Sequence, residues 1–259
     1  MKKFFTKVIA VGMILTMGLA FASCSSKKEQ TVQKGKLIMA TNAYFPPYEY
    51  YDGDKIVGID AEIAQAIADK LGLELEIQDV EFDSIIAGVQ SGKYDMGMAG
   101  MTVTDERKQS VNFSTSYATG IQAVIVKEDS PIKDLDALIS GDYTIGVQTG
   151  TTGDIYISGD LGEDNEDKVI RFSKGNDAVI ALTSGKVDAV VIDNEPAKAY
   201  VAANDGLVIF DTPYTVEDYA ICFNKDNTDL MDQVNDALKE LTDDGTIDGI
   251  IEKYIPSNG

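Results

Sequence analysis

The sequence predicts an α/β protein made of two similar lobes. Short apolar segments typical of strands alternate with segments of helical periodicity as far as Phe210. This alternation favours mostly parallel sheets, because parallel strands need crossover helices between them. One helix-to-strand unit also occurs twice, which suggests one copy in each lobe. After an N-terminal leader segment, the chain is long enough for two modest domains or one large one.

The first elements follow from simple patterns. Residues 37–41 form the first predicted strand, and residues 58–71 predict a helix whose Ile63, Ile67 and Leu71 share one face. Gly72 ends this helix, as glycine commonly does at a helix C-terminus. Residues 73–77 alternate apolar and acidic side chains, which predicts a half-buried strand.

The repeat joins residues 83–100 to residues 176–193, which align without gaps. Each copy starts with a residue suited to cap a helix, Asp83 or Asn176. An apolar helix follows and ends in Ser-Gly-Lys, where the glycine supplies a left-handed residue. An aspartate and a short apolar strand complete each copy. The alternative is that the match reflects the frequency of Ser-Gly-Lys turns in α/β proteins.

The repeat places Gly100 and Asp193 at equivalent strand ends. Ligands of open α/β sheets bind outside the carboxyl ends of the strands, and the boundary between two domains is a favoured place for small-molecule sites. Gly100 lets a ligand approach the backbone closely. The Asp193 carboxylate is suited to an ammonium group, although it is equally suited to cap the helix that begins near Glu195.

A candidate anion site follows Gly100. Thr102 offers a hydroxyl and an N–H group, and Arg107 is one of two arginines beside twenty lysines. A guanidinium group binds a carboxylate through two parallel, charge-assisted hydrogen bonds. The alternative is a solvated Arg107 paired with Asp105 or Glu106. We assign the other arginine, Arg171, a structural role.

Three loops carry weaker signals. Residues 146–153 join a strand to a helix, whose first N–H groups favour an anion, but they lack the lysine of a phosphate loop. Residues 44–51 are dense in aromatic side chains that either wall a pocket or pack in a surface loop. Phe82 precedes a helix and is more typical of a core. The acidic residues 160–167 do not have calcium-loop spacing, so we expect no metal.

The N-terminus predicts secretion. Three lysines precede an apolar run over residues 8–21, which has the length of a signal-peptide core and is short for a membrane span. Small residues and then Cys24 follow, as in the bacterial lipoprotein signal. We therefore predict a signal peptide over residues 1–23, a lipid on Cys24 and a flexible tether over residues 24–35. The alternative is an ordinary signal peptide with an incidental cysteine.

Composition excludes several classes of function. The formal charge is −21, and −24 without the signal peptide, which removes three lysines and no acids. Such a chain is unsuited to nucleic acid and suited to the outside of a cell. The sequence has no histidine, which excludes Ser-His-Asp and Cys-His catalysis and histidine-bearing metal sites. With Cys24 acylated, Cys222 has no disulfide partner, and its strand-like context favours a buried thiol.

In combination and in order, these segments resemble the family-3 extracellular solute-binding proteins, the polar amino acid receptors of bacterial ABC importers. The resemblance covers residues 36–254. Ala61 departs from the family signature, where a larger apolar residue is usual. The segments that carry the resemblance are residues 45–48, 58–71, 99–107, 112–114, 148–152 and 244–246.

The resemblance implies a periplasmic-binding-protein type II fold, with two α/β lobes around a ligand cleft. Two hinge strands join the lobes, near residues 117–121 and 217–220. Lobe 1 comprises residues 36–119 and 220–259 and so includes the C-terminal helices, and lobe 2 comprises residues 120–219.

The resemblance also implies a role for each site residue. Arg107 binds the ligand α-carboxylate with help from Thr102, Thr151 and Thr152. Asp193 binds the α-ammonium group together with the Gly100 carbonyl. Phe45 and Phe82 enclose the side chain, and Gln148 lines the edge of the pocket on lobe 2.

The function that follows is capture of an L-amino acid by hinge closure and delivery to an ABC importer permease. The protein is then a monomeric, extracytoplasmic lipoprotein, not an enzyme, with no cofactor and no nucleic acid partner. Asn42 stands where several relatives have an aspartate that meets a cationic or amide side chain. A neutral Asn42 therefore favours a polar neutral or sulfur-containing amino acid.

Two alternatives remain open. A dehydratase that acts on a prephenate- or arogenate-like acid shares this fold, and it needs a further acid in the pocket, for which Glu49 and Glu195 are the candidates. A sensor domain that feeds a signalling receptor is the second alternative.

Overall fold

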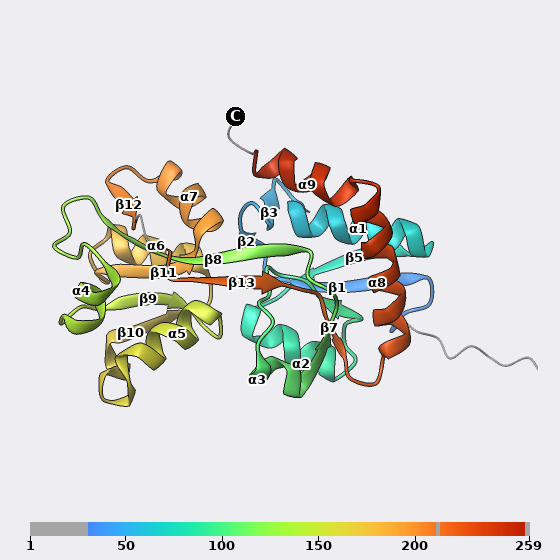
Figure 1. The fold of residues 1–259 in the computed structure, drawn as a ribbon, viewed down its shortest axis with the longest axis horizontal. Helices are drawn as coiled ribbons and strands as arrows, with labels where there is room; N and C mark the ends of the chain where they lie inside the picture. The colour runs from blue at the N-terminus through green and yellow to red at the C-terminus, as the bar shows by residue number, and fades with distance from the viewer. Residues whose placement is uncertain (1–30, 211–212, 257–259) are drawn as a thin grey trace, which may run out of the picture.

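The computed structural model describes residues 31–210 and 213–256, and these form two α/β lobes, each built on its own main sheet. Figure 1 shows them side by side, joined in the middle by two extended strands. The predicted signal peptide, Cys24 and the first part of the predicted tether lie outside the described residues. Within the described residues, no helix has the length and apolar composition that crossing a membrane requires.

Lobe 1 is built on a five-stranded sheet with strand order β5-β1-β6-β14-β7, beside a small antiparallel sheet of β2, β3 and β4. Its elements are β1 (Lys36–Thr41), β2 (Tyr44–Phe45), β3 (Glu49–Asp52), β4 (Lys55–Val57), α1 (Ile59–Leu71), β5 (Glu74–Asp79), the 3₁₀ turn η1 (Phe82–Ser84), α2 (Ile85–Gln90), β6 (Met96–Gly97), α3 (Asp105–Ser110), β7 (Val111–Phe113), β14 (Cys222–Asn224), α8 (Thr228–Asp243) and α9 (Thr246–Tyr254).

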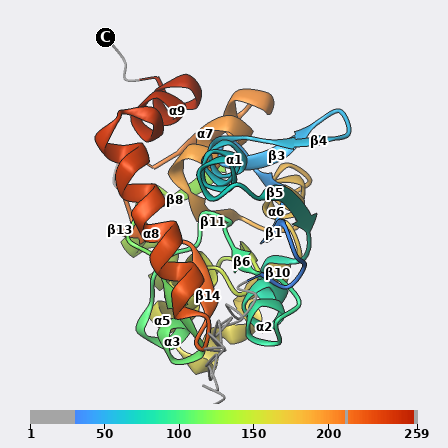
Figure 2. The ribbon, with the colours of Figure 1, turned by 90° about the vertical axis from the view of Figure 1, so that its right-hand side faces the viewer.

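Both faces of this sheet are buried. In β1, Leu37 and Met39 belong to one apolar cluster and Ile38 and Ala40 to another, as the two-residue period of a strand requires. α1 covers the first face together with α8 and α9, which arrive from the far end of the sequence (Figure 2). Cys222 of β14 is fully buried on the second face, as predicted.

Lobe 2 has a second sheet with strand order β10-β9-β11-β8-β12, and β13 also pairs with β8. Its elements are β8 (Ala118–Lys127), α4 (Leu135–Ser140), β9 (Ile145–Gln148), α5 (Thr152–Leu161), η2 (Glu163–Lys168), β10 (Val169–Phe172), α6 (Gly175–Thr183), β11 (Ala189–Asp193), α7 (Asn194–Ala203), β12 (Leu207–Ile209) and β13 (Thr215–Tyr219).

The two sheets share one plan, which the prediction of mostly parallel strands captured in part. Three parallel strands form one side of each sheet, β5-β1-β6 and β10-β9-β11, and the next strand is antiparallel, β14 or β8. β8 and β13 pair antiparallel from Ala118 opposite Tyr219 to Gln122 opposite Thr215, and both run between the lobes. The division at residues 119/120 and 219/220 remains our proposal.

The repeated unit ends its helix identically in both lobes. Gly92 and Gly185 have φ of 72° and 73°, in the left-handed region that glycine tolerates. The following lysine amides donate back to Gly88 O at 2.9 Å and to Ala181 O at 2.8 Å, which closes a Schellman motif each time.

The start of each repeated helix was predicted wrongly. Asp83 lies within η1, ahead of α2, and Asn176 is the second residue of α6, so neither caps a helix. A 3₁₀ turn, in which the Ser84 amide donates to Glu81 O at 3.0 Å, leads into α2. α6 already begins at Gly175, where a Cβ atom would lie 2.7 Å from the Ile192 side chain, so close packing favours glycine at this position.

The repeated aspartate holds the neighbouring parallel strand in both lobes. Asp95 accepts hydrogen bonds from the Ile38 amide at 2.7 Å and the Val32 amide at 2.6 Å. Asp188 accepts from the amide and the hydroxyl of Thr144, just before β9, at 2.8 and 2.9 Å. Asp95 is 2% exposed, whereas Asp188 is exposed.

This difference predicts unequal effects of removing the two carboxylates. Asp95→Ala leaves the buried Ile38 N–H group unpaired and should lower the free energy of unfolding by about 2–3 kcal/mol. Asp188→Ala exposes its partner to water and should cost about 1 kcal/mol or less. Urea unfolding of both variants measures the two values, and equal losses would contradict this account.

Candidate ligand-binding site

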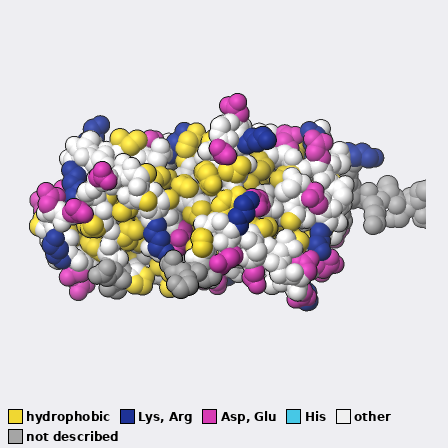
Figure 3. All heavy atoms as spheres, turned by 90° about the horizontal axis from the view of Figure 1, so that it is seen from above, with side chains coloured by type: hydrophobic (Ala, Val, Ile, Leu, Met, Phe, Trp, Pro, Cys, Tyr) yellow, Lys and Arg dark blue, Asp and Glu magenta, His cyan; other side chains and the backbone are white. Residues whose placement is uncertain are grey.

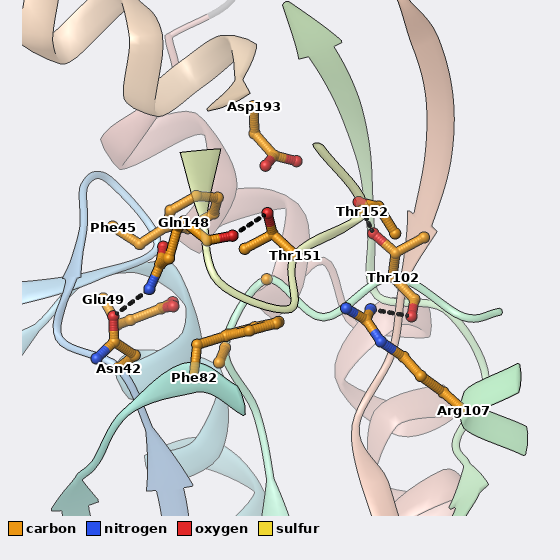
Figure 4. Close-up of a pocket in the computed structure, with 12 residues that line it drawn as sticks. Asn42, Phe45, Glu49, Phe82, Thr102, Arg107, Gln148, Thr151, Thr152 and Asp193 are labelled. Carbon is orange, nitrogen blue, oxygen red and sulfur yellow. Dashed lines mark hydrogen bonds between the residues drawn. The ribbon is translucent and has the colours of Figure 1, made fainter. Parts of the chain in front are cut away.

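A pocket with an empty volume of about 320 Å³ lies between the two lobes. Figure 4 shows side chains from both lobes converging on it. The structure brings all ten residues predicted from the sequence to this pocket and adds Glu49 and Ala99. The lining residues are Asn42, Phe45, Glu49, Phe82, Ala99, Gly100, Thr102, Arg107, Gln148, Thr151, Thr152 and Asp193.

Arg107 enters the pocket from α3 of lobe 1. The Thr104 hydroxyl caps this helix by accepting from the Arg107 amide at 3.1 Å. The guanidinium donates to Thr102 O at 2.7 Å and, across the cleft, to Gly150 O at 3.0 Å, and it lies 5.4 Å from the centre of the Phe82 ring. Both hydrogen-bond partners are neutral carbonyls.

The alternative of a solvated, paired Arg107 is wrong. Arg107 is 7% exposed, and no ion pair joins it to an acid among the described residues. Lys108 pairs with Asp105 instead, at 3.4 Å. Burial lowers the pKa of Arg107, although a guanidinium stays charged at neutral pH. The cation is therefore placed in the cleft without a counter-charge in direct contact.

Arg171 has the predicted structural role. Its guanidinium contacts Asp154 at 2.9 Å, and Asp154 accepts from the Gly150 amide at 3.1 Å. Thr151 caps α5: its hydroxyl accepts from the Asp154 amide at 3.3 Å and donates to Gln148 O at 2.8 Å. These bonds fix the loop before α5, so that the first turn of this helix faces the pocket.

A hydrogen-bonded chain links the pocket to the crossing strands. The hydroxyls of Thr102 and Thr152 lie 3.4 Å apart across the cleft. Thr152 donates to the Glu217 carboxylate at 3.0 Å, and Gln122 donates to the same oxygen at 3.0 Å. Glu217 lies on β13 and Gln122 on β8, so both crossing strands contact the anion-binding side of the pocket.

Asp193 ends β11 in lobe 2 and is 6% exposed. It occupies the N-cap position of α7, but its side chain makes no capping hydrogen bond. Instead it accepts from the Tyr219 hydroxyl. Burial raises the pKa of Asp193 to about 7, because the ionised carboxylate has lost its water and also faces Glu217.

Gly100 is held beside the pocket by a residue that the sequence analysis did not single out. Its φ is 51°, and a Cβ atom would lie 2.7 Å from the Phe45 ring, so a side chain does not fit. Its amide donates to Asp60 at 2.8 Å. Asp60 is fully buried on α1 and also accepts from the Tyr117 hydroxyl at 2.9 Å. The sequence did contain a signal for this role, because Asp60 is an acid on the same apolar helix face as Ile63 and Ile67.

Glu49 was named in the sequence analysis as a nominal acid, and the structure places it in the pocket wall, 1% exposed. It is the cross-strand partner of Phe45 in the β2–β3 hairpin, so both side chains point to one face. The other nominal acid, Glu195, pairs with Lys198 at 2.6 Å and does not line the pocket.

The two lobes contact each other around the pocket. The Gln148 side-chain amide donates to Asn42 Oδ1 at 2.9 Å. The Tyr200 hydroxyl donates to Tyr44 O at 2.5 Å, and the Lys174 ammonium lies 3.6 Å from the centre of the Tyr44 ring. These contacts close the cleft on the side opposite Arg107.

Fold and site together define a two-lobed protein whose pocket between the lobes is lined by one guanidinium group and two carboxyl groups. The chain belongs to the bacterial extracellular solute-binding proteins, family 3, whose family model matches residues 37–257. Both the fold and the family predicted from the sequence are thereby confirmed.

Several characterised relatives are similar over nearly the whole chain. The arginine-binding extracellular protein ArtP of Bacillus subtilis is 36% identical, with 98% of each chain covered. An ancestral arginine-binding protein bound to glutamine has a TM-score of 0.81 and 40% identity, covering 87% of this chain and 100% of that one. The arginine-, lysine-, histidine-binding protein ArtJ of Geobacillus stearothermophilus has a TM-score of 0.81 and 35% identity, covering 86% and 96%.

The raised pKa values predict that the ligand-free protein becomes more stable as the pH falls from 8 to 5. Asp60, with a pKa of about 6, and Asp193, with a pKa of about 7, bind protons more tightly in the folded state than in the unfolded chain, where the value is 3.8. Between its unfolded-state and folded-state pKa values, each group changes the free energy of unfolding by up to about 1.4 kcal/mol per pH unit. This stabilisation is lost as the pH rises through the folded-state pKa.

Urea unfolding at several pH values measures this effect. Asp60→Asn and Asp193→Asn should each flatten the pH dependence, which separates these two groups from the general repulsion among surface acids. A pH dependence that survives unchanged in both variants would contradict the assignment.

Proposed function

We propose that the protein captures an L-amino acid outside the cell and delivers it to an ABC importer. The observation that carries this proposal is that Arg107 from lobe 1 and Asp193 from lobe 2 line the same pocket. An amino acid zwitterion is costly to dehydrate, so each of its charges needs a partner inside the protein. The α-carboxylate belongs at Arg107, Thr102 and the start of α5, and the α-ammonium at Asp193 and the Gly100 carbonyl.

Binding on this scheme is coupled to closure. The two charged partners belong to different lobes, so both are satisfied by one ligand when the lobes approach. The ligand then shifts the hinge equilibrium by its higher affinity for the closed form, and an importer can recognise that form. Lipid attachment through Cys24 keeps the protein at the cell membrane in this proposal.

The far end of the pocket receives the ligand side chain between Phe45 and Phe82, next to Asn42, Gln148 and Glu49 (Figure 4). These groups suit a long polar side chain. The relatives are described as binding arginine, lysine, histidine or, in one ancestral protein, glutamine. The buried Glu49 brings cationic side chains into consideration, which Asn42 alone had disfavoured.

The dehydratase alternative is not supported by the charges of the pocket. A prephenate-like substrate carries two carboxylates, and Arg107 is the one cation among the described residues that line the pocket, which also include Glu49 and Asp193. The acidic excess favours a ligand with at least one positive charge.

On the face shown in Figure 3, lysine and arginine side chains are scattered among acids and form no basic patch.

A thermal-shift screen against the twenty L-amino acids tests the proposal. The described fold begins at Thr31, so a chain that starts after Cys24 retains all of it. A ligand at 100 times its dissociation constant should stabilise the protein by about 2.7 kcal/mol, a shift of several degrees. A well-folded protein that responds to none of the amino acids would contradict the proposal.

Removing either charged partner should abolish tight binding. Arg107→Ala and Asp193→Asn each leave a ligand charge buried without its partner, at a cost of about 3–5 kcal/mol, or more than about 100-fold in affinity. Lys108→Ala removes the neighbouring, exposed cation and serves as the control. Calorimetric titration measures all three, and unchanged affinity in both site variants would refute the assignment.

A further inference from the structure

An acid in the pocket wall, Glu49, is in contact with a second acid that does not line the pocket, Asp60. Glu49 of β3 and Asp60 of α1 are 1% and 0% exposed, and their side chains lie within hydrogen-bonding reach of each other. Glu49 Oε2 and Asp60 Oδ1 are both buried and have no hydrogen-bond partner among the described residues. Two ionised carboxylates in contact repel each other, and neither has a proton to donate. One proton shared by the two carboxyl groups removes this repulsion and supplies a donor to the pair.

The surroundings of the pair decide which of the two acids holds the proton. Asp60 accepts from the Gly100 amide and the Tyr117 hydroxyl, and both bonds stabilise its ionised form. No donor of this kind contacts Glu49 within the described part of the chain. Burial, the Asp60 carboxylate and, more weakly, Asp193 of β11 raise the pKa of Glu49 well above its usual value. The pKa of Asp60 is raised less, to about 6.

The groups that face Glu49 from neighbouring elements carry no positive charge. They are Asp60 from α1, Asp193 from the end of β11, and the hydroxyl-bearing rings of Tyr48, Tyr117 and Tyr200. Arg107 lies at the other end of the pocket, against Phe82 and Gly150. No described cation is therefore in place to hold Glu49 ionised in the empty pocket.

We propose that Glu49 and Asp60 share one proton, and that this proton makes Glu49 the residue that distinguishes a cationic ligand side chain from a neutral one. The inference rests on the proposed function and identifies a specificity residue within the same site. With a neutral side chain, the shared proton stays and Glu49 presents a carboxylic acid. With a guanidinium or ammonium side chain, the proton leaves to solvent, Glu49 becomes a carboxylate and the buried positive charge is neutralised.

Asp193 also contributes to the number of protons released on ligand binding. Every amino acid brings an ammonium group to Asp193, so every ligand releases the fraction of a proton that Asp193 carries near pH 7. When the proton release of two ligands with the same α-amino acid group is compared, the contribution of Asp193 cancels. L-Arginine and L-citrulline form such a pair, because they match in length and shape and differ by a guanidinium against a neutral urea group.

Calorimetric titration in two buffers of different ionisation enthalpy counts the protons released. The wild type should release up to one proton more with arginine than with citrulline at pH 7. Its affinity for arginine relative to citrulline should rise by up to tenfold per pH unit between pH 6 and pH 8.

Two variants at the pair should respond differently. Glu49→Gln should lose the extra proton and at least tenfold of the relative affinity for arginine. Asp60→Asn removes the neighbouring charge, so that Glu49 ionises more readily. Because burial still raises the pKa of Glu49, this variant should release a smaller part of the extra proton than the wild type and should retain the affinity for arginine. Glu195→Gln, whose carboxylate pairs with Lys198, should behave as the wild type does.

The outcomes separate this inference from the proposed function. Equal proton release for arginine and citrulline in the wild type would overturn the inference while leaving the proposed function intact. A Glu49→Gln protein with undiminished preference for arginine would overturn it as well, as would a wild type that binds citrulline and not arginine. If the wild type binds arginine but not citrulline, the comparison is made between variants for arginine alone. A Glu49→Gln protein that releases as many protons as the wild type would then overturn the inference, and one that releases fewer would support it. A wild type that binds no amino acid would contradict the proposed function itself.

Discussion

The cleft between the lobes buries more negative than positive charge, and the arrangement of the site depends on this imbalance. The buried groups in and beside the pocket comprise one guanidinium, that of Arg107, and four carboxyl groups on both lobes and on a crossing strand, namely Glu49, Asp60, Asp193 and Glu217. Burial of charge is costly unless hydrogen bonds or opposite charges compensate it. Tyr117, Tyr219, Gln122, Thr152 and the Gly100 amide provide hydrogen bonds to these acids, and the remaining imbalance favours a ligand that carries positive charge.

The same groups connect the site to the fold. Glu217 and Gln122 belong to the two strands that cross between the lobes, and both contact the hydroxyl-bearing side of the pocket through Thr152. Tyr117 precedes the first crossing strand and donates to Asp60, while Tyr219 ends the second and donates to Asp193. A change of charge in the pocket therefore acts directly on the residues next to the hinge. On the proposed function, ligand recognition and lobe closure would therefore involve the same hydrogen-bonded groups.

The sequence predicted the parts of this arrangement that follow from local pattern or from family motifs. The repeat aligned Gly100 with Asp193, and both line the pocket, although β6 ends at Gly97 and Gly100 follows it in a loop, whereas Asp193 is the last residue of β11. The motif around Arg107 located the cation. What it did not predict depends on pairing between distant segments. Glu49 points into the pocket because β2 pairs with β3, and Asp60 matters because Gly100 approaches it from forty residues away. The helix starts at Asp83 and Asn176 were predicted wrongly because a 3₁₀ turn that contains Asp83 precedes α2 and because α6 already begins at Gly175.

The central claim, that the pocket recognises both charges of an amino acid, is tested most directly with head-group analogues of whichever amino acid binds. Calorimetric titration of the wild type should compare the amino acid with its methyl ester, which lacks the anion for Arg107, and with its deaminated acid, which lacks the cation for Asp193. The account predicts that each analogue binds more than about 100-fold more weakly than the parent. An ester or a deaminated acid that binds as tightly as the amino acid would contradict it.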